Sequence, residues 1–158
     1  MISLSAAVAI DENGSEVILS LDELELGYRT SIFKKKKYVI TGCLIELQPG
    51  DRDEIERTMN ELKEKRISKQ PLEYPSAGST FKRPEGYFAG MLIEDAGLRG
   101  YSVGGAQVSE KHCGFVVNKG GATATDVYRL IADVQKKVFE SSGVKLSPEV
   151  ILLGDFEA

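Results

Sequence analysis

The pattern of apolar and polar residues predicts antiparallel strands at the start of the chain. Short apolar or alternating runs at 3–7 and 16–19 flank Asp11-Glu12-Asn13-Gly14, and Asn-Gly is typical of a tight hairpin turn. A further run over 38–47 is rich in Val, Ile and Leu and is followed by Pro49-Gly50, which favours another strand. We therefore expect a β-rich first segment.

A helix with an apolar stripe is predicted next, capped by Asp51 or Asp53 and ended before Pro71. Continuing its stripe by four residues leads to Arg66. An arginine in that position either snorkels at the rim of a buried face or binds an anion, and the first is the more frequent case. The stripe consists of Ile55, Met59 and Leu62.

The second half of the chain has a mixed pattern. Residues 71–84 read as a loop rich in Pro, Gly and Ser, 87–96 as a short helix, and 100–118 as strand-like runs. The clearest helix is predicted over 126–142, and a last strand over 150–153. This irregular order indicates an α+β fold, a small antiparallel or mixed sheet with helices packed on it.

Composition narrows the functional classes. The chain has 158 residues, 42% of them hydrophobic, so it can bury a core. Its 20 basic and 24 acidic residues create no general field for nucleic acid or an anionic membrane. Residues 1–10 are too short and lack the basic leader of a signal or membrane span. Cys43 and Cys113 lack the spacing of metal ligands, so no metal site is expected. Two cysteines are also too few for a secreted disulfide scaffold, which fits a reducing cytoplasm.

Common catalytic motifs such as GxGxxG, the Walker loop, HExxH and GxSxG are absent from the sequence. Ser79 follows Gly78, which can present a hydroxyl to a cleft, although such a serine is most often a turn residue. Arg29 can clamp a carboxylate, although an arginine near a strand end is usually solvated. Glu149 stands between a proline and an apolar run, a setting that would raise the pKa of its carboxyl, although a strand-edge charge that faces water is the more frequent case.

Two further features have simple structural interpretations. The run Lys34–Lys37 is typical of a solvated turn or a protected sheet edge. His112, the only histidine, is expected to be a hydrogen-bonded structural residue. The residues alone therefore indicate a small α+β domain with a possible anion site.

Three segments resemble, in order and approximate spacing, the signature blocks of the UDP-N-acetylenolpyruvoylglucosamine reductases. They are Gly27–Lys34 (GYRTSIFK), Gln70–Pro84 (QPLEYPSAGSTFKRP) and Ser147–Val150 (SPEV). The stretch between the last two blocks also looks like that family, so the resemblance covers nearly the whole chain. The shortness of 47–54 is similar to the type that lacks an extra substrate loop.

The resemblance implies a flavoenzyme of peptidoglycan synthesis. In that family NADPH reduces FAD, and a hydride then passes to the enolpyruvyl group of a UDP-sugar. By resemblance, Ser79 donates the proton, while Arg29 and Glu149 stabilise the enolate-like intermediate. The residues matching substrate-binding positions are Arg66, Lys69, Lys82 and Arg83.

The resemblance also implies a division of the chain. Residues 1–49 would be the end of the second, FAD-binding-type domain, and 50–158 the C-terminal substrate domain. The family's N-terminal FAD domain would be absent, so we expect FAD to be bound mainly by that missing region and this chain alone to be inactive. The expected partner is a UDP-sugar, with no nucleic acid or membrane, in the bacterial cytoplasm. The alternative is a stand-alone nucleotide-sugar binding module without catalysis.

Overall fold

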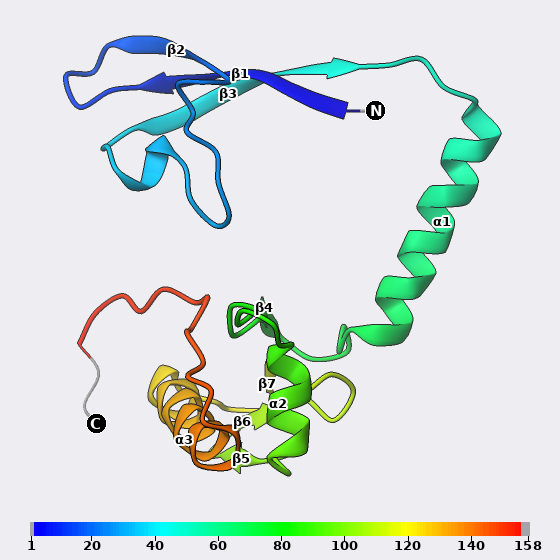
Figure 1. The fold of residues 1–158 in the computed structure, drawn as a ribbon, viewed down its shortest axis with the longest axis vertical. Coiled ribbons are helices and arrows are strands. Elements are labelled where there is room, and N and C mark those ends of the chain that lie inside the picture. Colours follow the sequence, from blue (N-terminus) through cyan, green and yellow to red (C-terminus); the bar gives the residue numbers. More distant parts are fainter. Residues whose placement is uncertain (1, 156–158) are drawn as a thin grey trace. The chain divides into compact units, whose positions relative to one another are not determined.

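The computed structural model describes residues 2–155 of the chain. They form two compact units that divide between Arg57 and Thr58, within helix α1 (Arg52–Lys69). Figure 1 shows this helix as one continuous element. Each unit is described by itself.

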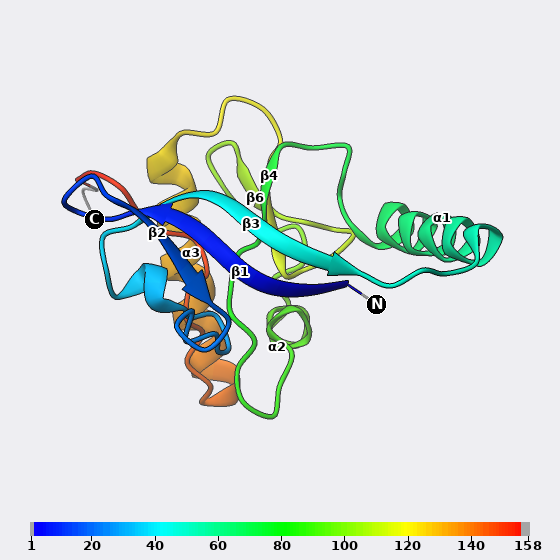
Figure 2. The same cartoon turned by 90° about the horizontal axis from the view of Figure 1, so that it is seen from above.

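The first unit is a three-stranded antiparallel sheet in the order β2-β1-β3. Its strands are β1 (Ile2–Ile10), β2 (Glu16–Ser20) and β3 (Val39–Leu47), which run side by side in Figure 2. The predicted hairpin is confirmed, because Ile10 pairs with Glu16 and Gly14 takes a φ of +80° in the turn. The first unit is therefore β-rich, as the alternating pattern predicted.

A small apolar cluster holds this sheet to the segment that follows β2. Leu24 and Ile32, the latter in the short 3₁₀ helix η1 (Ile32–Lys34), are buried against Ala7 and Leu19. Much of β3 remains uncovered within the described residues. Its exposed large apolar side chains are Val39, Ile40, Leu44, Ile45 and Leu47.

Helix α1 confirms the predicted element but not its predicted burial. Asp51 is the cap, since its Oδ1 accepts the Glu54 amide at 2.8 Å. No described residue of α1 is buried, and the stripe of Ile55, Met59 and Leu62 is exposed. The expectation that Arg66 prolongs a buried face is therefore wrong. Helical spacing shows which residues share a face, but only packing decides whether that face is covered.

The second unit contains a four-stranded antiparallel sheet in the order β4-β7-β6-β5. The expected loop over 71–84 contains one of these strands, so that prediction was incomplete. The strands are β4 (Ser76–Ser79), β5 (Ser102–Val103), β6 (Ala106–Val108) and β7 (Phe115–Asn118).

Two helices complete the core of the second unit. Helix α2 (Ala89–Asp95) and helix α3 (Ala124–Ser142) contact each other, and α3 also packs against β5 and β6. Helix α3 begins with a capping box between Thr123 and Asp126 and ends at Gly143, whose φ is +71°. The predicted α+β fold is confirmed. Fully buried members of the core are Ile93, Val108, Leu130, Val134 and Val138.

The predicted final strand over 150–153 is wrong. The backbone before it does pair, because Pro148 forms an isolated bridge with Phe81. Ile151 and Leu153 are 80% and 84% exposed, and residues 150–153 form no strand. An apolar run becomes a strand only where a neighbouring edge accepts its hydrogen bonds, and no described edge does so here.

Candidate functional site

Ser79 stands at the end of β4, an edge strand of the four-stranded sheet. It pairs with Phe115, and the register is irregular between Ser76 and Ser79. Gly78 provides the irregularity with a φ of +90°, and a Cβ built there meets no atom within 4 Å. The glycine thus leaves open space directly beside the exposed serine.

Ser79 lines an open cavity of about 440 Å³. One wall comes from β4 and the residues after it, a second from α2, and a third from the turn that precedes β7. Both apolar and charged side chains line it. The polar and aromatic members that matter here are Ser79, Arg83, Phe88, Arg99, Lys111 and His112.

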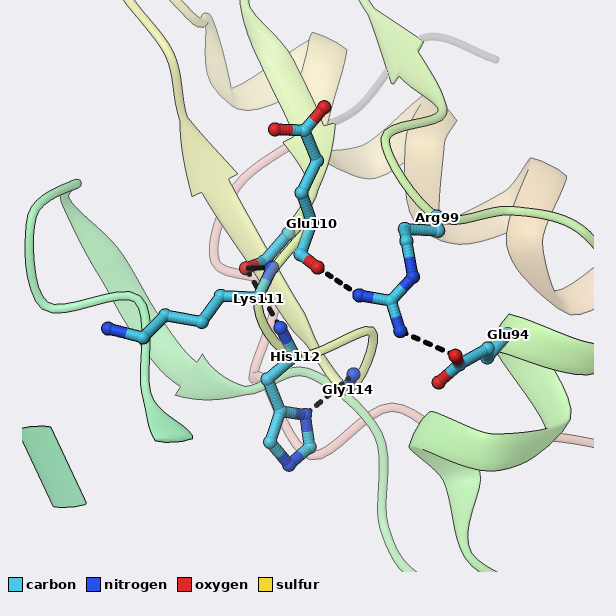
Figure 3. A network of polar contacts seen from close by, with 7 residues as sticks. Glu94, Arg99, Glu110, Lys111, His112 and Gly114 are labelled. Atoms are coloured by element: carbon cyan, nitrogen blue, oxygen red, sulfur yellow. Dashed lines mark hydrogen bonds and ion pairs between the residues drawn. The ribbon is translucent and has the colours of Figure 1, made fainter. Parts of the chain in front are cut away.

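Cations dominate the polar lining of this cavity. Arg83 lies over the ring of Phe88, with its Cζ 4.0 Å from the ring centroid. Arg99 donates to Glu94 Oε1 at 2.5 Å and to the Glu110 carbonyl, as Figure 3 shows. The hydrogen bond that Arg99 donates to Glu94 is the largest cause of the raised pKa of Arg99. The cavity therefore suits an anion that also offers a flat apolar surface.

His112 presents its ring to the same cavity. Its Nδ1 accepts the Gly114 amide at 3.0 Å (Figure 3), so the expected structural hydrogen bond is confirmed. The ring stands edge-on to Phe115, with 5.0 Å between centroids. A Cβ on Gly90 or Gly114 would come within 3.2 or 3.0 Å of His112 Cε1, so these glycines make room for the ring. The sequence interpretation missed that a structural histidine can also line a site.

Glu149 is brought next to the serine strand. Its amide donates to the Thr80 carbonyl at 2.8 Å, and Lys82 donates its amide to Ser147 at 2.9 Å. Thr80 is itself buried, and its Oγ1 accepts the Val116 amide at 3.1 Å. Two predicted catalytic residues, Ser79 and Glu149, therefore lie one residue apart across paired segments.

Arg29 belongs to the first unit and Ser79 to the second, so their action on one substrate stays a prediction. It lies in a tight turn in which Gly27 and Thr30 exchange backbone hydrogen bonds at 3.1 and 3.3 Å. Its φ of +56° is in the left-handed region, which costs a residue with a Cβ about 1–2 kcal/mol. The Arg29 carbonyl accepts Lys34 Nζ at 2.7 Å, which holds the turn. Such an uncommon conformation motivates a functional role for this arginine.

The four predicted substrate-binding cations have different surroundings. Arg83 lines the cavity beside Ser79, whereas Arg66, Lys69 and Lys82 are not among its lining residues. Arg66 and Lys69 are exposed on the last turn of α1. Sequence reasoning missed Arg99, Lys111 and Phe88, because each is an ordinary surface residue type until the fold gathers them.

The described residues lack two features that would point to another class of protein. Within residues 2–155, no cluster of three or more His, Cys, Asp or Glu side chains is arranged to hold a metal ion. In the same part of the chain, no helix is both long and apolar enough to cross a membrane.

Fold and cavity together define a small α+β domain with an open, cation-lined site beside an exposed serine. The chain belongs to the UDP-N-acetylenolpyruvoylglucosamine reductase family, whose C-terminal domain model matches residues 70–153.

Similar proteins cover almost all of the chain. A UDP-N-acetylenolpyruvoylglucosamine reductase of Agathobacter rectalis is 60% identical over 150 residues, which is 95% of this chain and 48% of that protein. A protein of the same name from Clostridium perfringens is 58% identical over 151 residues, or 96% of this chain and 50% of that protein. The crystal structure of the Thermus caldophilus reductase matches with a TM-score of 0.80 and 33% identity, covering 93% of this chain and 52% of that one. The chain thus spans about half the length of the relatives it matches.

Proposed function

We propose that this chain is the substrate-binding and proton-donating part of a UDP-N-acetylenolpyruvoylglucosamine reductase. The whole enzyme reduces the enolpyruvyl ether of a UDP-sugar to the lactyl ether needed for peptidoglycan, using NADPH and FAD in the bacterial cytoplasm. The observation that carries the proposal is an exposed serine at a cation-lined cavity, with a glutamate on the adjoining segment. Relatives that bear this enzyme's name favour it over a stand-alone binding module.

The division of the chain follows the same proposal. Residues 1–49 are the end of an FAD-binding-type domain, and 50–158 are the substrate domain. When bound, FAD supplies the hydride that it has taken from NADPH. The open backbone at Gly78, where a Cβ would meet no atom within 4 Å, fits a flat ring beside Ser79. Most of the residues that hold FAD belong to the part of the relatives' length that this chain does not span.

Ser79 has the role of proton donor. A hydride arriving at the terminal vinyl carbon leaves negative charge on the adjacent carbon and on the carboxylate attached to it. That adjacent carbon then takes the proton of the Ser79 hydroxyl, which solvent replaces. A serine is a weak acid, so its proton moves only when the acceptor carries developing charge and neighbouring cations stabilise the oxygen left behind.

Arg29 and Glu149 stabilise the charge that reaches the substrate carboxylate. The guanidinium does this as a permanent cation, and the Glu149 carboxyl group does it through a hydrogen bond to the same oxygens. Interactions that strengthen as charge develops act on the transition state rather than on the bound substrate. Pairing of Glu149 with Thr80 supports this role, since it puts the carboxyl on the segment beside Ser79.

The remaining cations grip the UDP-sugar. Arg83 on the Phe88 ring offers a charge and a flat apolar surface within the cavity. Arg66 and Lys69 on the last turn of α1, together with Lys82, supply charge for the diphosphate. The substrate carries both a diphosphate and a planar base, so this mixture of groups matches its chemistry.

Replacing Ser79 by Ala in the full-length flavoprotein tests the proposal. We expect reduction of the flavin by NADPH to keep its rate, because no proton is donated to substrate in that step. Reoxidation by the UDP-sugar should slow by about 10²-fold or more, the range of a lost general acid. Stopped-flow absorbance of the flavin separates the two half-reactions, with Ser102→Ala on β5 as the matched control. Unchanged reoxidation in Ser79→Ala would refute the role of the hydroxyl.

A further inference from the structure

The last turn of α1 is held by a lysine that the catalytic proposal does not use. Lys111 Nζ donates to the Ile67 carbonyl at 2.8 Å and lies 3.6 Å from Glu73 Oε2. The last four carbonyls of a helix have no intrahelical partner, and a cation there also meets the negative end of the helix dipole. Lys111 therefore satisfies one of these carbonyls on a helix that has no buried residue of its own.

The other end of this contact is anchored in the core of the second unit. Ser109 is buried, and its Oγ accepts the amides of Lys111 and His112, each at 3.2 Å. The Ser109 amide in turn donates to the Phe115 carbonyl at 2.9 Å. The lysine thus projects from a turn whose backbone is fixed, and its long side chain has a firm base.

Three consecutive residues of this turn, Glu110, Lys111 and His112, contact different parts of the second unit. The Glu110 carbonyl accepts Arg99, Lys111 reaches α1, and His112 lines the cavity. Figure 3 shows the Lys111 side chain extending away from the His112 ring. The last turn of α1 and the cavity wall are therefore tied to consecutive residues of a single turn.

We propose that Lys111 is a positioning residue that fixes the last turn of α1, and with it Arg66 and Lys69, for the diphosphate of the substrate. This inference rests on the proposed function, which assigns those two cations to the diphosphate. Arg66 lies one residue before the carbonyl that Lys111 holds, and Lys69 two residues after it. Without Lys111 no packed face would hold this turn, since the apolar stripe of α1 is exposed.

A double-mutant cycle in the full-length flavoprotein tests the inference. Lys111→Met should raise the KM for the UDP-sugar about tenfold, the effect of one lost hydrogen bond to a charged group, with a smaller change in kcat. Arg66→Met should also raise KM. The double variant should raise it by much less than the product of the two factors, because both changes remove the same contact. Lys111→Arg should restore part of the affinity.

Lys119→Met is the matched control, because Lys119 donates to Tyr74 rather than to α1. Its effect on KM should multiply with that of Arg66→Met. A second readout needs no substrate: hydrogen exchange of the amides of residues 66–70 and 72 should be faster in Lys111→Met than in wild type or Lys119→Met.

The outcomes separate the two proposals. A wild-type protein that does not reduce the UDP-sugar overturns the proposed function. An active wild type whose Lys111→Met variant has the same KM and the same exchange rates overturns only the inference. Multiplicative effects of Lys111→Met and Arg66→Met on KM also overturn it, since they would show that the lysine does not act through the arginine.

Discussion

The Glu149 amide donates a hydrogen bond to the Thr80 carbonyl at 2.8 Å, and this bond places two residues that are 70 positions apart in sequence, Ser79 and Glu149, on paired segments. The pairing continues through Pro148 and Phe81. Backbone pairing of this kind sets the position of a side chain more firmly than a loop does. The backbones that carry Ser79 and Glu149 are therefore adjacent at this point of the fold.

Substitution of Glu149 distinguishes the protonated from the charged carboxyl. In the full-length enzyme we expect Glu149→Ala to lower kcat about 10²- to 10³-fold, as for a lost oxyanion donor. Glu149→Gln should retain more activity, because its amide can still donate a hydrogen bond. Steady-state kinetics with Glu140→Gln on α3 as a control measure both effects. A Gln variant as weak as the Ala variant would contradict the donor role.

The capping box of α3 predicts an acid-dependent loss of stability. Hydrogen bonds from Thr123, above all from its backbone amide, lower the pKa of Asp126. A lowered pKa in the folded state means that the stabilisation is present above the unfolded value of about 3.9 and is lost as the pH falls through the folded value. Asp126→Asn should therefore flatten the pH dependence of the free energy of unfolding below about pH 4.

The threonine of the same box should contribute to stability near neutral pH, because its side chain accepts the Asp126 amide. Thr123→Ala should reduce the free energy of unfolding by about 1 kcal/mol, the usual value for an N-cap. Denaturant unfolding followed by far-UV circular dichroism measures it, with Thr125→Ala in the same turn as the control. Equal effects at both positions would show that the box contributes nothing specific.

The two cysteines should differ strongly in reactivity. Cys113 is 4% exposed, and burial raises the pKa of its thiol, so the reactive thiolate is scarce at neutral pH. Cys43 is exposed on β3. We expect a thiol reagent to modify Cys43 rapidly in the native 158-residue chain and Cys113 only after unfolding, and mass spectrometry gives the order. In Cys43→Ser, rapid modification of the remaining thiol would contradict the buried environment.

Local patterns were sufficient for most elements. The Asn13-Gly14 turn and the alternation around it predicted the first hairpin, and the helix predicted over 126–142 starts two residues after the observed start of α3 and ends at the same residue. These signals are read within a few residues, where backbone geometry and capping act. Strand β4 was not predicted, because Ser, Ala and Gly have little preference for strands and pair here only because β7 offers an edge.

By itself, the sequence determined the α+β class, the helix and strand periods, and, through three blocks of similar sequence, the candidates Ser79, Arg29 and Glu149. Only the tertiary structure decided that Glu149 pairs beside Ser79, that Arg99, Lys111 and His112 gather at the cavity, and that the stripe of α1 stays exposed. The physical reason is the separation in sequence over which each kind of interaction acts. Propensity and periodicity act between neighbours along the chain, whereas burial and convergence depend on which distant segments pack together.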